Sequence, residues 1–523
     1  MTTTTRVPLW SAALSGLIAV AAAIAAGHLV AGLLLTPQAS PFLAVGNSAI
    51  DRTPGAVKDF AIRNFGTNDK AALLVGMAVV LALVGIAIGL ISRRSAVPGL
   101  AAIAVVGVVG GLAVHGRSVA TVGLLAPAAS LVVGLAVFWW LHRWAAAPKD
   151  VSANGASGPD RRRFLLGSLG AGVGAAVAGW CGFALANRID VAASRKAVGE
   201  LVPTTPAPPI PPGAAFPELG TPTFITPAAD FYRIDTNLSV PQLRAEDATL
   251  RITGLVDEPM ELSFDEIRAM PLVEKTITMT CVSNEVGGPY VSTANFIGVP
   301  LMEVLDRAGI QSGAQQLVGH SVDGFTLGTP LDMLRASKDA MLVIGMNREA
   351  LPPEHGFPLR TVVPGLYGYV SATKWLTELE LATYDVKPYW VERGWDGQPP
   401  GVVPIKISSR IDAPTSFQQV PGGPGGGITI AGTAWAQGRG ISRVEVRVDS
   451  GEWQPAELAT EVNPNTWRMF RLTTPLPAGQ HTVACRAYDG QGVMQAEQRL
   501  RLINPGLVPD GSTGWHSILF TAA

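Results

Sequence analysis

Five long stretches in the first 190 residues contain no Asp, Glu, Lys or Arg, and they limit the fold more than any other feature. They cover residues 9–35, 71–91, 97–114, 119–141 and 164–186. A bilayer core needs about 20 residues of helix, and a helix satisfies its own backbone hydrogen bonds there. The glycines and alanines of these stretches favour close helix packing in lipid. The sequence therefore predicts a membrane α-helical bundle of about five spans over residues 1–190.

Composition agrees with a chain that lies partly in lipid. Hydrophobic residues make up 48% and charged residues 15%, and the mean hydropathy is +0.30, which is more apolar than a typical soluble protein. A formal net charge of −1 provides no large field of one sign, so nucleic acid is not an expected partner. The three cysteines, Cys181, Cys281 and Cys485, are too few for a disulfide framework, and no Cys-x-x-Cys motif is present.

Basic residues flank the apolar stretches on one side of the predicted membrane. They are Arg6, Arg93, Arg94, Arg143, Lys149 and Arg161–Arg163. Short cytoplasmic loops carry such an excess of Lys and Arg. With five spans, we expect a multi-pass protein of the cell membrane whose remaining residues lie on the extracytoplasmic side. The stretch DRRRFLL at 160–166 also resembles a twin-arginine export signal, although the same arginines would equally anchor the last span.

Three further segments follow the apolar part. Residues 191–223 are a proline-rich linker that predicts an extended, stiff spacer. Residues 224–400 alternate strand patterns with helical ones, including a Ser-x-x-Glu capping box in 263–270, which predicts an α+β domain. Residues 401–523 contain short strands divided by turn residues, a pattern typical of an all-β immunoglobulin-like sandwich.

A single cysteine, Cys281, ends a strand-like run and is followed by the turn-forming sequence VSNEVGGPY. A thiolate at the end of a strand would contact any ligand of the following loop. From the residues alone, Cys281 could also be a buried free cysteine or could form a disulfide with Cys485.

Three ordered motifs carry a resemblance to a known family: TCVSNEVGG, HGFPLRTVVPGLYGYVSATKW at 355–375, and HTVACRAYDGQGVMQ near the C-terminus. Together they resemble the sulfite oxidase family of molybdopterin enzymes over roughly residues 224–516. The resemblance implies that the Cys281 thiolate binds molybdenum beside the two dithiolene sulfurs of one molybdopterin, since soft sulfur suits this metal. It also implies two-electron oxo transfer to or from a small sulfur compound such as sulfite.

The same resemblance assigns the other residues of the site. It places His355, Arg360 and Lys374 at the pterin and its phosphate, with backbone contacts from Ala372 and Thr373 and a further contact from the loop of Asp323. Guanidinium and ammonium groups bind phosphate well. Arg233, in the stretch FYRID, matches an arginine that faces the metal, and we expect it to clamp an oxyanion.

Two departures from the family concern the substrate. Trp395, in RGWDG at 393–397, stands where the family usually has a tyrosine, and indole donates a hydrogen bond but does not titrate. The family's second substrate arginine is absent from residues 503–523, where Trp515 and His516 remain. With fewer cations to hold a sulfite dianion, a neutral sulfoxide becomes an alternative substrate.

The path of the electrons leaves several readings open. No fused haem domain is recognisable, so the chain needs an electron carrier, either a cytochrome or a quinone-linked partner. His28 and His115 fall at one depth of the predicted bundle and could ligate a haem b, or the bundle could serve as an anchor alone. The resemblance also implies a homodimer. The competing functions are a sulfoxide reductase-like enzyme fed by membrane carriers and a non-catalytic exported binding protein.

Overall fold

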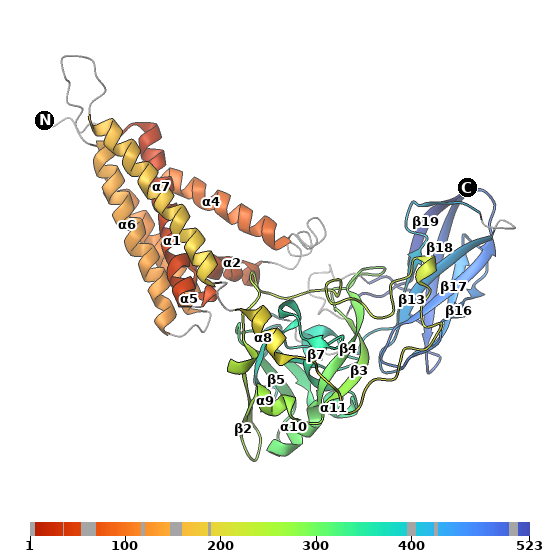
Figure 1. Cartoon of the computed structure of the whole chain (residues 1–523). Coiled ribbons are helices and arrows are strands. Elements are labelled where there is room, and N and C mark those ends of the chain that lie inside the picture. The colour runs from red at the N-terminus through yellow and green to blue at the C-terminus, as the bar shows by residue number, and fades with distance from the viewer. Residues whose placement is uncertain are drawn as a thin grey trace. The chain divides into compact units, whose positions relative to one another are not determined.

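The structure is a computed structural model in which two compact units are described separately. Its described residues are 6–34, 36–53, 69–116, 121–146, 159–186, 190–394, 404–422, 427–500 and 511–523. The first unit comprises Met1–Asp190 and Thr236–Gln242, and the second comprises Val191–Asp235 and Leu243–Ala523. Figure 1 shows the helices of the first unit in red to yellow and the strands of the second in green to blue.

The first unit contains five long helices, which confirms the number of apolar helices predicted from the sequence. They are α1 (Leu9–Leu33), α4 (Asp69–Ile91), α5 (Val97–His115), α6 (Leu125–Ala146) and α7 (Pro159–Ala186). By length and composition, each of the five is able to cross a membrane. A shorter helix, α2 (Pro41–Arg52), carries polar residues, so hydropathy does not reveal it.

Glycines allow these helices to approach closely. On α1, a Cβ at Gly16 would collide with the carbonyl oxygen of Gly85 on α4, and a Cβ at Gly89 on α4 would collide with that of Ala12 on α1. A Cβ at Gly182 of α7 would lie 2.7 Å from the main-chain carbon of His28. Close backbone contact through small residues is the packing that helices use in lipid.

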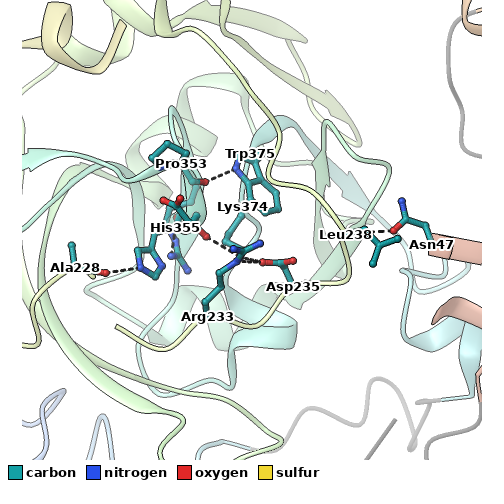
Figure 2. Close-up of polar contacts among 11 residues, drawn as sticks. Asn47, Ala228, Arg233, Asp235, Leu238, Pro353, His355, Lys374 and Trp375 are labelled. Atoms are coloured by element: carbon teal, nitrogen blue, oxygen red, sulfur yellow. Dashed lines mark hydrogen bonds and ion pairs between the residues drawn. The ribbon is translucent and has the colours of Figure 1, made fainter. Parts of the chain in front are cut away.

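Two polar side chains buried in the first unit form hydrogen bonds within it, although the hydroxyl groups of Ser130 and Ser168 have no partner among the described residues. His142 Nε2 donates to the carbonyl oxygen of Ser92 at 2.8 Å. The main-chain N–H of Leu238, in the segment 236–242, donates to Asn47 Oδ1 at 3.2 Å (Figure 2). Each bond satisfies a group that would otherwise be buried without a partner.

The second unit begins with a five-stranded sheet that supports the candidate site. Its order is β2 (Met260–Ser263), β1 (Thr249–Gly254), β10 (Leu376–Ala382), β5 (Gln316–Ser321) and β6 (Thr326–Pro330). The pair β1–β10 is parallel and the other pairs are antiparallel. The predicted capping box is present, since Ser263 and Glu266 exchange hydrogen bonds at the start of α9 (Phe264–Arg268).

A second sheet carries Cys281 at the end of one of its strands. It contains β3 (Val273–Thr280), β4 (Val291–Pro300), β7 (Met341–Met346), β8 (Glu349–Ala350) and β9 (Arg360–Val362). Strands β3 and β4 pair up to Thr280 and Val291, so the loop between them begins at Cys281. Two short helices, α10 (Leu301–Ala308) and α11 (Leu331–Ala336), follow β4 and β6.

The C-terminal part is built from two sheets around one core, and we call it the two-sheet domain. One sheet has β11 (Ser408–Ala413), β13 (Gly427–Trp435), β17 (Arg468–Pro475) and β16 (Glu457–Leu458), and the other has β12 (Gln419–Val420), β19 (His516–Ala522), β18 (Gly479–Asp489), β14 (Ile441–Val448) and β15 (Gln454–Pro455). Cys485 is fully buried in this core. Because Cys281 and Cys485 are both free thiols, the disulfide alternative is wrong.

The segment predicted as a linker, residues 191–223, begins with a helix, and its proline-rich part packs against the rest of the second unit. This part follows α8 (Val191–Val198), and the N–H of Thr204 donates to the carbonyl oxygen of Leu272 at 2.7 Å. Phe216 is buried in one cluster with Trp435 and Trp467 of the two-sheet domain. Residues 204–216 are therefore part of the folded unit.

Gly89→Val should loosen the helix bundle, because its side chain would meet the backbone of Ala12. We expect a loss of roughly 1–3 kcal/mol, the usual cost of overpacking, seen as a lower Tm of the detergent-solubilised protein. Gly76→Val is the matched control, because nothing lies within 4 Å of a Cβ at Gly76 on the same helix. Equal losses in both variants would contradict close packing at Gly89.

Candidate functional site

Cys281 is buried at the first position of a closed loop. Its side chain is 8% exposed. Its N–H donates to Tyr290 O at 3.0 Å, and its carbonyl oxygen accepts from the N–H of Asn284 at 3.0 Å. Burial raises the pKa of the Cys281 thiol, and hydrogen bonds from Ser283 oppose this in part. A thiolate in this position therefore needs a positive partner such as a metal.

The strand before Cys281 is buried on both faces, which explains its mixture of threonines and apolar residues. The hydroxyl groups of Thr278 and Thr293 lie 2.5 Å apart, and Thr280 Oγ1 accepts from Gln437 Nε2 at 2.9 Å. On the opposite face, Ile277 is 1% exposed. Because the hydroxyl groups of Thr278 and Thr280 are paired, the end of β3 that leads to Cys281 is held in place.

Tyr232 lies beside Cys281 and was not predicted from the sequence. Burial raises the pKa of the Tyr232 phenol, the charge of Cys281 raises it further, and the charge of Arg360 lowers it. The main-chain N–H of Tyr232 donates to Ser292 Oγ at 3.2 Å, and its ring stacks on Phe231 with 5.4 Å between centroids. Tyr232 is thus a buried, neutral phenol that interacts electrostatically with the thiol and the guanidinium.

Arg360 begins β9 and is buried without a carboxylate partner among the described residues. It is 4% exposed. Its guanidinium donates to the carbonyl oxygens of His355 at 3.0 Å and Thr361 at 3.4 Å, and to Met279 Sδ at 3.7 Å. Burial lowers the pKa of Arg360 to about 10. A buried cation held by neutral acceptors is suited to an anionic ligand.

His355, whose carbonyl oxygen accepts from Arg360, has a neutral imidazole that donates a hydrogen bond. Its Nε2 donates to the carbonyl oxygen of Ala228 at 2.9 Å (Figure 2), which leaves Nδ1 as the acceptor. Burial, followed by the charge of Arg360, lowers the pKa of His355 to about 4. The edge of the ring meets Phe231 with 5.3 Å between centroids.

Lys374, Asp235 and Arg233 form a shared ion pair, in which Asp235 was not predicted from the sequence. Asp235 Oδ2 accepts from Lys374 Nζ at 3.1 Å and from Arg233 Nε at 2.7 Å (Figure 2). Burial lowers the pKa of Lys374 to about 8, although Asp235 opposes this. The side chain of Arg233 is 34% exposed and that of Asp235 is 4% exposed. The expected oxyanion clamp is thus engaged with an internal carboxylate.

Asp323 adds a second carboxyl group to this cluster. Its Oδ1 accepts from the N–H of Phe325 at 2.9 Å. Burial raises the pKa of Asp323, and Asp235 raises it further while Lys374 lowers it. Asp323 therefore interacts electrostatically with Lys374, and its contact with the pterin stays a prediction.

The turn before Lys374 offers a hydroxyl group instead of main-chain donors. It follows α12 (Gly368–Ser371). The N–H of Ala372 already donates to Gly368 O at 3.1 Å, and that of Thr373 donates to Thr361 Oγ1 at 2.9 Å. Thr373 Oγ1, by contrast, is buried and has no hydrogen-bond partner among the described residues.

Together these residues fit the cofactor that the resemblance implied. Arg360, Lys374 and the unpaired Thr373 hydroxyl suit a phosphate group, and Cys281 offers soft sulfur. Where residues are described, no cluster of three or more His, Cys, Asp or Glu could hold a metal, so Cys281 would be a single protein ligand. Trp395 lies outside the described residues, and its assignment stays a prediction.

Comparison with known proteins identifies both parts of the second unit. Residues 237–390 match the oxidoreductase molybdopterin binding domain, and residues 402–518 match the Mo-co oxidoreductase dimerisation domain. Neither match includes the five long helices.

Three relatives illustrate the likeness. Human mitochondrial sulfite oxidase is 29% identical over 348 residues, which are 58% of this chain and 62% of that protein. The NADH nitrate reductase of Ulva prolifera is 30% identical over 310 residues, 48% of this chain and 36% of that protein. An uncharacterised oxidoreductase of Bacillus subtilis (strain 168) is 35% identical over 153 residues, 29% of this chain and 74% of that protein.

The chain spans less than two thirds of the length of the human enzyme. The first domain match includes Cys281, Arg360 and Lys374, and the second includes most of the two-sheet domain. The chain also covers 74% of the Bacillus relative at 35% identity. The chain therefore belongs to the sulfite oxidase family of molybdopterin-dependent oxidoreductases.

Proposed function

We propose that this protein is a membrane-anchored molybdenum oxidoreductase that transfers two electrons to or from a small sulfur compound, with sulfite as the first candidate. The observation that carries the proposal is Cys281, a buried thiol whose pKa burial raises and whose charge acts on Tyr232. The same phenol interacts with the buried Arg360. A soft ligand, a hydroxyl group and a cation therefore interact electrostatically in one buried region.

The residues of the chain have separate tasks in this proposal. Arg360, Lys374 and Thr373 would bind the phosphate and pterin, and His355 would donate or accept a hydrogen bond there without adding charge. Molybdenum bound to Cys281 would supply the two-electron oxo transfer. Tyr232, as a neutral hydroxyl group, would orient a substrate oxygen by donating a hydrogen bond.

The balance of charge bears on the substrate. Oxidation of sulfite to sulfate consumes one water and releases two protons and two electrons, and a dianionic substrate needs cationic donors. Arg233 is partly offset by Asp235, to which it bonds at 2.7 Å. This pairing favours a second candidate, reduction of a neutral sulfoxide to a thioether and water with two protons and two electrons. The related nitrate reductase indicates that the family accepts different oxo compounds.

Location and partners follow from the first unit and the family. The five apolar helices and the arginines on one side of them support a multi-pass protein with the second unit on the extracytoplasmic side. A cytochrome or quinone-linked carrier would exchange the electrons. Residues 402–518, which match a dimerisation domain and which we propose to be an immunoglobulin-like sandwich, would join two copies. A haem b between His28 and His115 stays a hypothesis, and His28 Nδ1 lies 3.3 Å from Ser40 Oγ.

The function is tested by Cys281→Ser in protein isolated from cells that make the cofactor. We expect turnover of sulfite with an artificial electron acceptor, or of a sulfoxide with a reduced dye, to fall by more than about 100-fold, because the metal loses its protein ligand. Cys181→Ser in α7 is the control with unchanged turnover. Wild-type protein without molybdenum, or a Cys281→Ser variant with normal turnover, would refute the proposal.

Arg360→Met separates cofactor binding from folding. In cofactor-free protein the change removes a buried charge, so we expect the free energy of unfolding to rise by about 1 kcal/mol or more. Pterin content of the loaded protein should fall, because the phosphate loses a charge-assisted donor. Arg471→Met, at a side chain that is 37% exposed, should change neither quantity. Lower stability of cofactor-free Arg360→Met would show that Arg360 is a structural residue.

A further inference from the structure

The loop that follows Cys281 is closed by its own hydrogen bonds and has two glycines, Gly287 and Gly288, on its outer side. Asn284 Oδ1 accepts from the N–H of Tyr290 at 2.8 Å, and the N–H of Gly288 donates to Glu285 O at 2.8 Å. Gly287 has φ +81°, a conformation that favours glycine. The loop therefore has a fixed shape and presents Gly287 and Gly288 to whatever packs against it.

His516 of the two-sheet domain packs directly on Gly287. A Cβ at Gly287 would collide with Nε2 and Cδ2 of the His516 ring. Nδ1 of this ring accepts from the N–H of Ile411 at 2.9 Å, so the ring orientation is set by β11. Burial, followed by the charges of Arg410 and Arg499, lowers the pKa of His516 to about 4, and the ring is neutral at neutral pH.

Arg410 holds the next residue of the loop from the same domain. Its Nη1 donates to the carbonyl oxygen of Gly288 at 2.8 Å, while its Nε donates to Asp412 Oδ1 at 2.6 Å. Asp412 in turn accepts from Thr433 Oγ1 at 2.5 Å. The guanidinium is thus fixed at one end by its own domain and bonded at the other end to the Cys281 loop.

A small polar pocket lies beside these two contacts. A cavity of about 10 Å³, room for one water molecule, lies between the loop and the two-sheet domain and is lined among others by Asn284, Glu285, Gln495 and Ser512. The Ser512 hydroxyl is buried and has no partner among the described residues. Polar groups therefore line this side of the loop, while Val282 at its start packs in an apolar cluster with Trp435 and Trp467.

We infer that Arg410 and His516 of the two-sheet domain are positioning residues for Cys281, because they hold the loop whose first residue is the thiol. The assignment goes beyond the role of joining two copies that the family name gives to residues 402–518. This inference rests on the proposed function at one point, which is that Cys281 is the metal ligand. The holding of the loop itself does not depend on a metal.

The experiment measures access to Cys281 in cofactor-free, full-length protein. The rate of alkylation by iodoacetamide is followed by mass spectrometry of the Cys281 peptide, so Cys181 and Cys485 do not interfere. Gly287→Ala should raise this rate about tenfold, because the new methyl group pushes the loop away from His516. Gly492→Ala is the control for backbone strain, since Gly492 also has φ +81° and nothing lies within 4 Å of its Cβ.

The double variant Gly287→Ala with His516→Ala makes the test specific. Removing the ring makes room for the methyl group, so the double variant should react no faster than His516→Ala alone, a non-additive result. Arg410→Lys keeps the charge beside Asp412 and loses the bond to Gly288, and it should raise the rate as well. In loaded protein the same variants should change the sulfur signal in the X-ray absorption spectrum.

Two results would overturn the inference. One is an alkylation rate of Cys281 in Gly287→Ala that equals the wild-type rate. If Gly287→Ala does not fold, wild-type rates in both His516→Ala and Arg410→Lys have the same meaning. The other is strict additivity of the Gly287 and His516 changes. Failure of the proposed function gives a different result. Wild-type protein that lacks molybdenum would refute the function, whereas non-additive alkylation rates of the Gly287 and His516 variants would still support the positioning role.

Discussion

A buried guanidinium that has no carboxylate partner among the described residues is the constraint on the sheet that carries Cys281. Taking a cation out of water costs several kcal/mol unless an anion or good acceptors compensate, and Arg360 has carbonyl oxygens and a thioether as its acceptors. Lys374 is similarly desolvated, yet it has Asp235. The polypeptide thus buries positive charge that its own acceptors satisfy incompletely, and an anionic ligand would compensate this charge.

What could be read from the sequence is local. The five apolar helices follow from composition, and Cys281, His355, Arg360 and Lys374 lie in short motifs. Asp235 could not be predicted as the partner of Lys374, because 139 residues separate them and an Asp at that spacing carries no signal. Tyr232 was adjacent to a named residue, but only the fold places its phenol at the thiol and the guanidinium.

The tertiary contacts of β3 show why neither half of the second unit suffices alone. Gln437 donates to Thr280 Oγ1, the N–H of Trp467 donates to Thr278 Oγ1 at 2.8 Å, and Asn463 Nδ2 donates to Thr276 O at 3.0 Å. These donors come from the two-sheet domain. The threonine-rich face of β3 would be exposed in an isolated sheet and is buried here by the two-sheet domain. The alternation of threonines and apolar residues in the sequence could not indicate what covers this face.

The proline-rich segment has a practical consequence for cutting the helices away. Phe216 shares a buried cluster with Trp435 and Trp467, and Arg195 of α8 donates to the carbonyl oxygens of Ala350 and Leu351 at 2.8 Å. A water-soluble fragment that starts at the first catalytic strand would expose these aromatic rings and aggregate. A fragment that starts near Val191 keeps these rings buried. It is therefore the first truncation to make for crystallisation.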